Sequence, residues 1–325
     1  MIVVTGGAGF IGSNLVAHLS AGADVVVCDR LRSNDKWRNL TTVAPADFVY
    51  PEQLFDALAH YRTAITSVIH MGAVSATTVT DGDLVVQSNF QLSRDLWRWC
   101  SEQEVPLIYA SSAATYGDGT KGFVDEAAEE HLAKLKPLNL YGWSKHWFDR
   151  WAVAQARRGL CPPSWAGLKF FNVYGPGEAH KGSMKSVVAH LFPKVAAGEP
   201  ARLFKSYHPD YPHGGQRRDF VYVKDCVAVV EWLLTQRATA GLFNVGTGRA
   251  RTFEDLAKAL MRALNVEPRI EYIDMPEALR DKYQYFTEAS LDNLRAVGYC
   301  APFTDLETGV ADYVHGHLMS VTHRP

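Results

Sequence analysis

Hydrophobic residues in the first half of the chain form short continuous runs that alternate with longer mixed stretches. Runs of this length predict strands buried on both faces of a sheet, and they fall at residues 1–5, 24–29, 65–70 and 105–112. The longer stretches have the spacing of helices and fall at residues 11–21, 51–62 and 84–103. This alternation predicts an α/β fold, with a doubly wound parallel sheet joined by right-handed crossovers.

The second half of the chain is less regular. After about residue 170, loops rich in proline and glycine occur at residues 172–182 and 207–215. Loops of this kind often carry binding groups on a rigid scaffold. The chain has 325 residues, so we expect either two domains or one domain with a sizeable additional lobe.

Composition and charge exclude several classes of partner. The sequence is 47% hydrophobic and 21% charged, with a formal net charge of −2. Without a dense basic run, nucleic acid and anionic membranes are not expected as partners. No apolar run has membrane-spanning length, and the first residues lack a signal-peptide pattern. Five scattered cysteines fit buried free thiols in a reducing compartment, so we expect a cytoplasmic protein.

A glycine-rich segment follows the first predicted strand and leads into the first predicted helix. Gly6, Gly9 and Gly12 permit a tight turn, close approach to a pyrophosphate, and close packing of helix on strand. The helix N-terminus then faces the negative charge. This placement predicts a dinucleotide-binding loop.

The end of the second predicted strand bears on the choice between NAD and NADP. Asp29 is positioned to accept hydrogen bonds from the adenosine ribose, which favours NAD. Arg30, Arg32 and Lys36 follow at once and could instead hold a 2′-phosphate, which favours NADP. At this point both cofactors stay open.

A tyrosine and a lysine four residues apart form the candidate catalytic pair. Tyr141 and Lys145 share one face of a predicted helix. A free tyrosine has a pKa near 10, so a nearby ammonium and an oxidised nicotinamide are needed to favour the phenolate. Ser112 lies at the end of the strand at 105–112, where a hydroxyl can hold the reacting oxygen.

Together these motifs resemble the extended short-chain dehydrogenase/reductase superfamily, whose members mostly modify nucleotide sugars. The resemblance is carried by TGGAGFIG, SSAATYG and YGWSK, with FNVYGPG, RRDFVYVKD and FNVGTG following in order. Within the superfamily, HMGAVSATT, PLNLYGWSK, FFNVYGPGEAHKGSM, RRDFVYVKD and KYQYFT are similar to the ADP-L-glycero-D-manno-heptose 6-epimerases. The stretch HKGSM discriminates best among these.

The resemblance implies a fold and an activity. It implies a Rossmann-type domain at 1–170, which also receives parts of 219–248 and 284–309, and a smaller substrate lobe formed mainly by 171–325. It further implies inversion of C6 of the heptose in ADP-D-glycero-D-manno-heptose, a step in supplying precursors of the lipopolysaccharide inner core. Tightly held NADP would be the cofactor, and the protein would be a homo-oligomer, commonly a pentamer.

The resemblance implies that Lys181, in the loop at 175–184, acts as a second acid/base. Inversion of a secondary alcohol carbon passes through a ketone, and the sugar must turn between two hydride transfers from one cofactor face. The alcohol oxygen then occupies two places, each of which needs its own proton acceptor. Tyr141 would serve one epimer and Lys181 the other, with burial and the charges of Lys145 and the nicotinamide lowering the lysine pKa. A phosphate clamp and a solvated charge are the alternatives.

The remaining site residues also follow from the resemblance. The cofactor would contact Gly6, Gly9, Phe10, Ile11, Gly12, Asp29, Arg30, Lys36, Met71, Gly72, Ala73, Val74, Ser75, Ser88, Lys145, Val173 and Lys181. The substrate would contact Asn172, Ser183, His190, Phe204, Lys205, Ser206, Arg218 and Tyr283. As a planar donor, Arg218 suits a diphosphate; the alternative for it is an ion pair with Asp219 or Asp225.

Three departures from the family pattern stand out. Pro51 replaces a basic residue near the third helix, Ser88 replaces an asparagine, and an insertion rich in histidine and tyrosine occupies 206–216. Its two histidines, His208 and His213, have no evident third ligand, so no metal site is predicted.

Rival functions remain. Another nucleotide-sugar epimerase, such as a UDP-hexose 4-epimerase, shares the motifs but has no evident use for HKGSM. A 4,6-dehydratase would need an Asp-Glu pair where Ala113 and Ala114 stand. A redox sensor that binds NADP without chemistry could lose the tyrosine or the lysine, and this chain keeps both.

Overall fold

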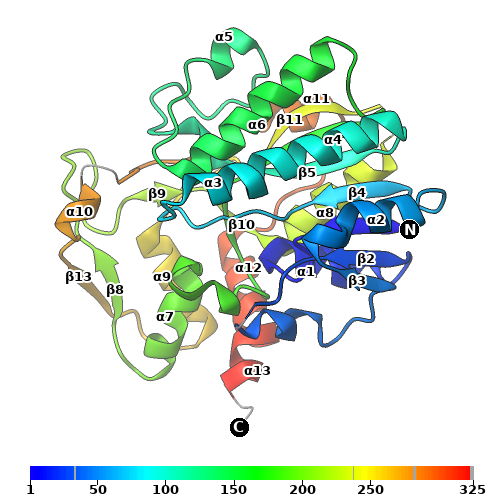
Figure 1. Ribbon diagram of the computed structural model, residues 1–325. Helices are drawn as coiled ribbons and strands as arrows, with labels where there is room; N and C mark the ends of the chain where they lie inside the picture. The colour runs from blue at the N-terminus through cyan, green and yellow to red at the C-terminus, as the bar shows by residue number, and fades with distance from the viewer. Residues whose placement is uncertain (33, 237, 281–282, 323–325) are drawn as a thin grey trace.

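A computed structural model describes residues 1–32, 34–236, 238–280 and 283–322. In this part of the chain, seven strands form one parallel sheet in the order β11-β6-β5-β4-β1-β2-β3 (Figure 1). From β1 the chain first adds β2 and β3 on one side of the sheet. It then crosses over and adds β4, β5, β6 and β11 on the other side, as in doubly wound dinucleotide-binding sheets. The predicted fold class is confirmed. The strands of this sheet are β1 Ile2–Thr5, β2 Val25–Cys28, β3 Asp47–Val49, β4 Ser67–His70, β5 Leu107–Ser112, β6 Trp165–Phe170 and β11 Ala240–Val245.

Helices cover both faces of the sheet because successive strand residues point to opposite sides. Val3 and Val26 face a core shared with α2, α4 and α6, whereas Val4 and Val27 face a core shared with α1 and α8. These helices are α1 Phe10–Leu19, α2 Leu54–His60, α4 Leu92–Glu102, α6 Leu140–Arg157 and α8 Val223–Thr235.

The helix predicted at 84–103 is interrupted. It consists of α3 Gly82–Val85, a π-helical segment η3 at Val86–Gln91, and α4. A π-bulge adds one residue to a turn and shifts every later side chain around the helix axis.

A smaller lobe lies beside the sheet domain, on the left of Figure 1, and has its own hydrophobic core. It is built around α7 Val187–Ala196, α9 Phe253–Ala263 and α12 Leu306–Tyr313. Short strand pairs accompany it: β7 Asn172–Tyr174 with β10 Phe220–Tyr222, β8 Ala201–Phe204 with β13 Ile270–Ile273, and β9 Arg217–Arg218 with β12 Arg251–Thr252. The exact division of the chain into domains stays a prediction.

The remaining elements are short. They are the 3-10 helices η1 Asp35–Leu40, η2 Pro51–Gln53, η4 Ala113–Tyr116 and η5 Ala179–Met184, the π-helix η6 Val314–Leu318, and the helices α5 Glu129–Leu132, α10 Glu277–Arg280, α11 Asp292–Ala296 and α13 Met319–Thr322. Among the described residues, no helix combines the length and apolar character needed to cross a membrane.

Trp97 anchors α4 in the core and gives a stability prediction. Its ring lies edge-on to Trp165 at 5.1 Å, and its Nε1 donates to Leu160 O at 2.9 Å. We expect Trp97→Ala to lower the free energy of unfolding by about 3–5 kcal/mol, because it opens a large cavity. The matched control, Trp37→Ala, removes a ring that is 47% exposed and should change it by about 0.5 kcal/mol or less. Chemical denaturation measures both, and equal losses would contradict the assignment.

Candidate active site

The glycine loop packs backbone against backbone at the point where β1 and β4 separate. A Cβ added at Gly6 would lie 2.6 Å from Gly72 N, and one added at Gly12 would lie 2.1 Å from Gly6 O. The cap residue of α1, Gly9, has no side chain, and the first turn carries no acidic residue. The positive end of α1 is therefore free to face an anion, and the cradle fits a dinucleotide pyrophosphate.

Acid–base pairs surround the predicted ribose site. Asp29 accepts from Ala8 N at 2.9 Å, which ties the end of β2 to the glycine loop. Its other carboxylate oxygen binds the Lys36 ammonium. Arg30 pairs instead with Glu52, next to Pro51. Lys36 thus balances the charge of Asp29, which the sequence did not indicate.

The candidate catalytic residues meet where β5 faces α6. Asn139 caps α6 by accepting from Gly142 N at 2.8 Å, which places Tyr141 in the first turn. A Cβ at Gly142 would lie 2.7 Å from Ala114 O, so this turn lies directly against η4. Lys145 Nζ donates to Ala110 O at 2.7 Å, and the Ser112 hydroxyl is close enough to the Tyr141 phenol to act on its pKa. The structure therefore brings Ser112, Tyr141 and Lys145 together.

Burial dominates the charge states of this pair. It raises the pKa of Tyr141; Ser112 lowers that pKa and Asp149 raises it. Burial also lowers the pKa of Lys145 to about 8, against an opposing effect of Asp149. The protein groups alone therefore do not lower the pKa of Tyr141. A further positive charge, such as an oxidised nicotinamide, is needed to favour the phenolate.

The loop that carries Lys181 is anchored by a buried carboxylate. Glu178 is 1% exposed and accepts from Ser186 Oγ at 2.6 Å and from the Ser186 amide. Ser186 in turn caps α7. Gly182, with φ of 57°, kinks η5 one residue after the lysine. The loop is therefore held at its base and turned sharply beside Lys181.

This loop is also tied to the cofactor side of the molecule. Asn39 Nδ2 donates to Ala8 O at 3.0 Å and to Gly177 O at 2.9 Å, bridging the two loops. Lys181 Nζ lies 5.2 Å from the centre of the Phe10 ring. Burial lowers the Lys181 pKa, although Glu178 acts in the opposite direction. Within the described part of the chain, Lys181 makes no hydrogen bond or ion pair with Tyr141.

The loop after β4 is braced by an asparagine that the sequence analysis did not single out. Val74 N donates to Asn89 Oδ1 at 2.8 Å, and Asn89 Nδ2 donates to Val74 O at 3.0 Å and Ser144 Oγ at 3.0 Å. Asn89 is fully buried, whereas Ser88 is not. The π-helical turn at 86–91 provides the reason, because it changes which residue faces the loop.

The other predicted cofactor and substrate residues fall on nearby segments. Gly72 N donates to Thr5 Oγ1 at 3.2 Å, and Val173 pairs with Val221 between β7 and β10. Ser183 O and His190 Nε2 are 3.1 Å apart, and Lys205 Nζ binds Asp274 at 3.1 Å. Asn172 begins β7, Phe204 ends β8, and Ser206 N donates to His213 Nδ1 at 3.0 Å.

Arg218 is a buried cation without an anionic partner among the described residues. It is 8% exposed, its Nη1 donates to Arg217 O at 2.8 Å, and it lies 5.2 Å from the centre of the Tyr283 ring. Asp219 binds Thr247, Gly248 and Ala289 instead. Asp225 binds Thr304. The ion-pair alternative raised for Arg218 is thereby excluded.

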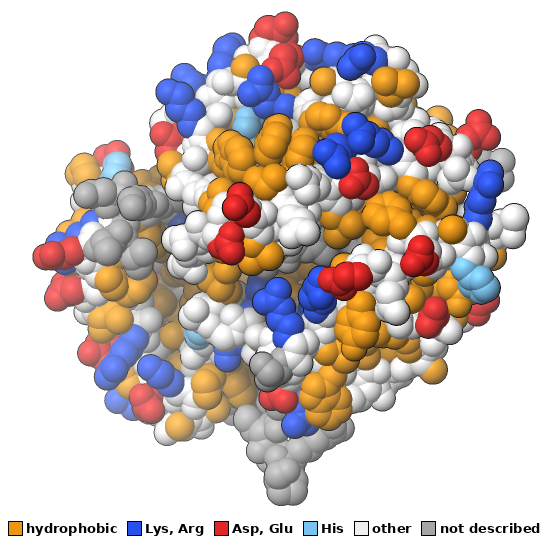
Figure 2. Space-filling model, viewed as in Figure 1, with side chains coloured by type: hydrophobic (Ala, Val, Ile, Leu, Met, Phe, Trp, Pro, Cys, Tyr) orange, Lys and Arg blue, Asp and Glu red, His pale blue; other side chains and the backbone are white. Residues whose placement is uncertain are grey.

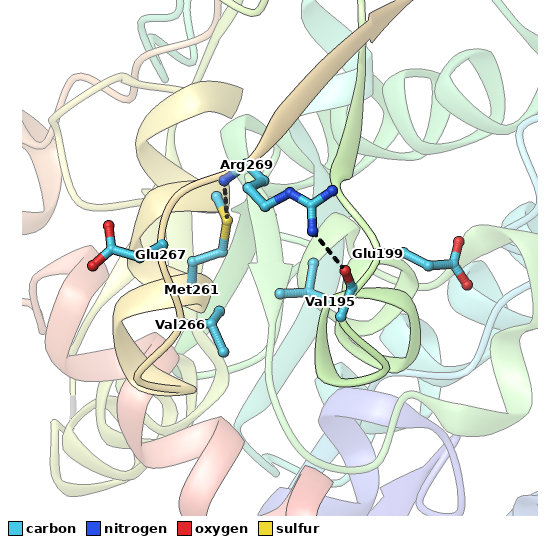
Figure 3. Close-up of a pocket in the computed structure, with 7 residues that line it drawn as sticks. Val195, Glu199, Met261, Val266, Glu267 and Arg269 are labelled. Carbon is cyan, nitrogen blue, oxygen red and sulfur yellow. Dashed lines mark hydrogen bonds between the residues drawn. The ribbon is translucent and has the colours of Figure 1, made fainter.

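The insertion at 206–216 packs against the segment that holds Tyr283. His208 and Tyr211 each contact the Tyr285 ring, with centroids 5.1 and 5.3 Å apart. The described residues include no group of three or more His, Cys, Asp or Glu arranged to hold a metal. A separate pocket between α7 and α9, shown in Figure 3, contains Met261 and Arg269 and none of the predicted site residues.

The crowding at Gly12 gives a prediction with a matched control. We expect Gly12→Ala to abolish binding of the nicotinamide dinucleotide, because the added Cβ would lie 2.1 Å from the Gly6 carbonyl oxygen. Gly22→Ala has nothing within 4 Å of the added Cβ and should bind normally. Cofactor fluorescence titration measures both. Unimpaired binding by the Gly12 variant would contradict a pyrophosphate site at this loop.

Comparison with known proteins agrees with this geometry. Residues 2–246 match the NAD dependent epimerase/dehydratase family. The chain is 50% identical over 323 residues to an ADP-L-glycero-D-manno-heptose-6-epimerase of Nitratidesulfovibrio vulgaris strain DP4, covering 98% of each chain.

Solved structures give the same fold. The ADP-L-glycero-D-manno-heptose-6-epimerase of Helicobacter pylori superposes with a TM-score of 0.80 at 29% identity, covering 98% of this chain and 96% of the other. A UDP-N-acetylglucosamine 4-epimerase of Methanobrevibacter ruminantium M1 superposes with a TM-score of 0.82 at 23% identity, covering 98% of each, which supports the fold alone. On the sequence match and the site geometry together, the chain belongs to the NAD dependent epimerase/dehydratase family.

Proposed function

We propose that this chain inverts C6 of the heptose in ADP-D-glycero-D-manno-heptose and yields the L-glycero epimer, as a step toward the lipopolysaccharide inner core. The observation that carries the proposal is the position of Lys181. Lys181 lies on a segment separate from Tyr141 and Lys145, and burial lowers its pKa. Asn39 links this segment to the glycine loop, because it donates to both Ala8 O and Gly177 O. A reaction with two alcohol positions needs two such groups. The 50% identity to a heptose epimerase supports the substrate.

The residues divide the work between two proton transfers. When bound, a nicotinamide dinucleotide would supply the hydride acceptor and donor for the ketone route. Tyr141 takes the hydroxyl proton of one epimer at its phenolic oxygen, with Ser112 orienting the sugar oxygen. After the sugar turns, Lys181 Nζ exchanges the proton at the second oxygen position. Arg218, with Tyr283 beside it, binds the substrate diphosphate and holds the nucleotide while the sugar moves.

We infer NADP as the preferred cofactor. Lys36 balances the charge of Asp29, so a 2′-phosphate meets less repulsion there than a free carboxylate would produce. His180 lies close enough to Lys36 and Asp29 for both charges to affect its pKa. Only the use of a nicotinamide dinucleotide follows from the family match.

We also propose a cytoplasmic homo-oligomer, with a pentamer as the family-based expectation. On the face drawn in Figure 2, hydrophobic side chains gather over the region of α4 and α6. Trp143 and Trp147 of α6 are 41% and 36% exposed, and Trp147 stacks on Phe90 with centroids 3.8 Å apart. Exposed aromatic clusters of this kind favour protein–protein contact.

The first test uses the purified protein and ADP-D-glycero-D-manno-heptose with no added cofactor. We expect the C6 epimers to interconvert, as followed by anion-exchange chromatography or proton NMR, because the cofactor is retained and recycled. Tyr141→Phe should lower kcat about 10²–10⁴-fold and leave NADP affinity unchanged, because it removes only the proton acceptor. No conversion, even with NADP and NAD supplied, would refute the heptose assignment. Near wild-type turnover by the variant would refute the role of Tyr141.

Lys181→Met separates a base from a phosphate clamp. We expect kcat to fall about 10²-fold or more, with little change in ADP or NADP affinity, since proton transfer at the second oxygen position is lost. Lys185→Met, directly after the same loop, is the matched control and should retain activity. Loss of affinity with kcat intact would make Lys181 a clamp.

A further inference from the structure

A fully buried ion pair lies directly behind the catalytic pair. Lys169, on β6, and Asp149, on α6, both have side chains that are 0% exposed, and Lys169 Nζ is 2.7 Å from Asp149 Oδ2. The lysine also donates to Thr115 Oγ1 at 2.8 Å. Neither residue was singled out by the sequence, and the proposed chemistry uses neither.

Asp149 belongs to the same helix face as the reactive groups. It follows Lys145 by four residues and Tyr141 by eight, so all three project toward β5. Three consecutive residues of β5 receive them. Ala110 O accepts from Lys145, Ser111 Oγ donates to Asp149 at 2.7 Å, and Ser112 faces Tyr141.

The carboxylate of Asp149 therefore acts on the active site. Its negative charge raises the pKa of both Tyr141 and Lys145. For Tyr141, this effect opposes formation of the phenolate that the reaction needs. An uncompensated carboxylate at this place would also be costly to bury.

Lys169 is the cation positioned to compensate it. Tyr109 donates to Asp149 Oδ1 at 3.1 Å and carries no charge, because burial raises its pKa well above the ordinary value. Burial lowers the pKa of His146 to about 4, so this ring is neutral near pH 7. Arg150, the next basic residue on α6, pairs with Glu129.

The other titratable groups near Asp149 are either neutral or bound to other partners. Burial raises the pKa of Tyr116 and of Asp125; Asp125 binds Asn244 N, and its pKa is about 6. On the far side of Lys145, burial lowers the pKa of His70 to about 3, and its ring lies between Thr5 and Ser93. Within the described residues, only Lys145 and Lys169 thus remain as cations facing Asp149 without another acidic partner.

We propose that Lys169 is a positioning residue for catalysis: it holds Asp149 behind the active site, offsets part of its charge, and so limits the effect of that charge on Tyr141 during turnover. The register between β6 and β5 sets the position of Lys169. It places Lys169 opposite Ser111, and the lysine side chain reaches α6 beside that serine. The inference rests on the proposed role of Tyr141.

Two single variants should shift the tyrosine in opposite directions. Lys169→Met leaves the carboxylate uncompensated, so the acidic limb of the kcat–pH profile should move to higher pH by about one unit. Turnover on that limb would then fall about tenfold. Asp149→Asn removes the negative charge and leaves Lys169 unpaired, so the limb should move to lower pH. The double variant, with neither charge, should return toward the wild-type profile.

A spectroscopic titration tests the same point without substrate. The ultraviolet absorbance of phenolate is followed against pH with NADP⁺ bound, and the Tyr141→Phe form of each variant is subtracted. Opposite shifts that cancel in the double variant support the proposal, whatever nucleotide sugar is turned over. Lys224→Met breaks the exposed Lys224–Asp312 pair and should shift nothing.

A purely structural ion pair would give a different result. Both single variants would then lower thermal stability and kcat with no opposite shift of the tyrosine pKa, and the proposal would be overturned. If Lys169→Met does not fold, Asp149→Asn, which preserves side-chain shape, still decides, since an unshifted titration would also overturn it.

Discussion

Close approach of two backbones at the centre of the sheet is the constraint on which the rest of the structure depends. β1 and β4 are adjacent, and the loops that follow them meet at Gly6 and Gly72 with no space for a Cβ at Gly6. This contact sets where α1 begins and directs its free amides toward the crevice. It also brings the loop after β4 beside Ser144 of α6, through Asn89. The predicted cofactor loop and the helix that carries Tyr141 and Lys145 therefore share one support.

The second loop of the site is linked to the first through side-chain amides. Asn39 bridges Ala8 and Gly177, and Asn14 donates to Pro176 O at 2.8 Å. Glu178 holds the other end of the segment from inside the protein. Lys181 is consequently placed relative to the glycine loop, and through it relative to the cofactor.

Much of the fold and part of the site could be predicted from the sequence. The strands and the glycine loop produce strong local patterns, because buried parallel strands are continuously apolar and tight backbone contacts require glycine. Tyr141 and Lys145 were found because helical spacing alone puts them on one face. Lys169 and Asp149 were missed, since their pairing depends on the register between β6 and β5, which leaves no local signal. Asn89 was missed for a related reason: a π-helical turn changes which residue points inward.

Burial has the largest effect on the pKa values of Tyr141 and Lys145. It disfavours the charged forms of both groups: it raises the pKa of Tyr141 and lowers that of Lys145 to about 8. The oxidised nicotinamide carries a positive charge and the reduced form does not. A bound oxidised nicotinamide would therefore favour the phenolate of Tyr141, whereas a reduced one would favour the neutral phenol. In the proposed reaction, which runs through a ketone and back, the protonation state of Tyr141 would thus follow the redox state of the cofactor.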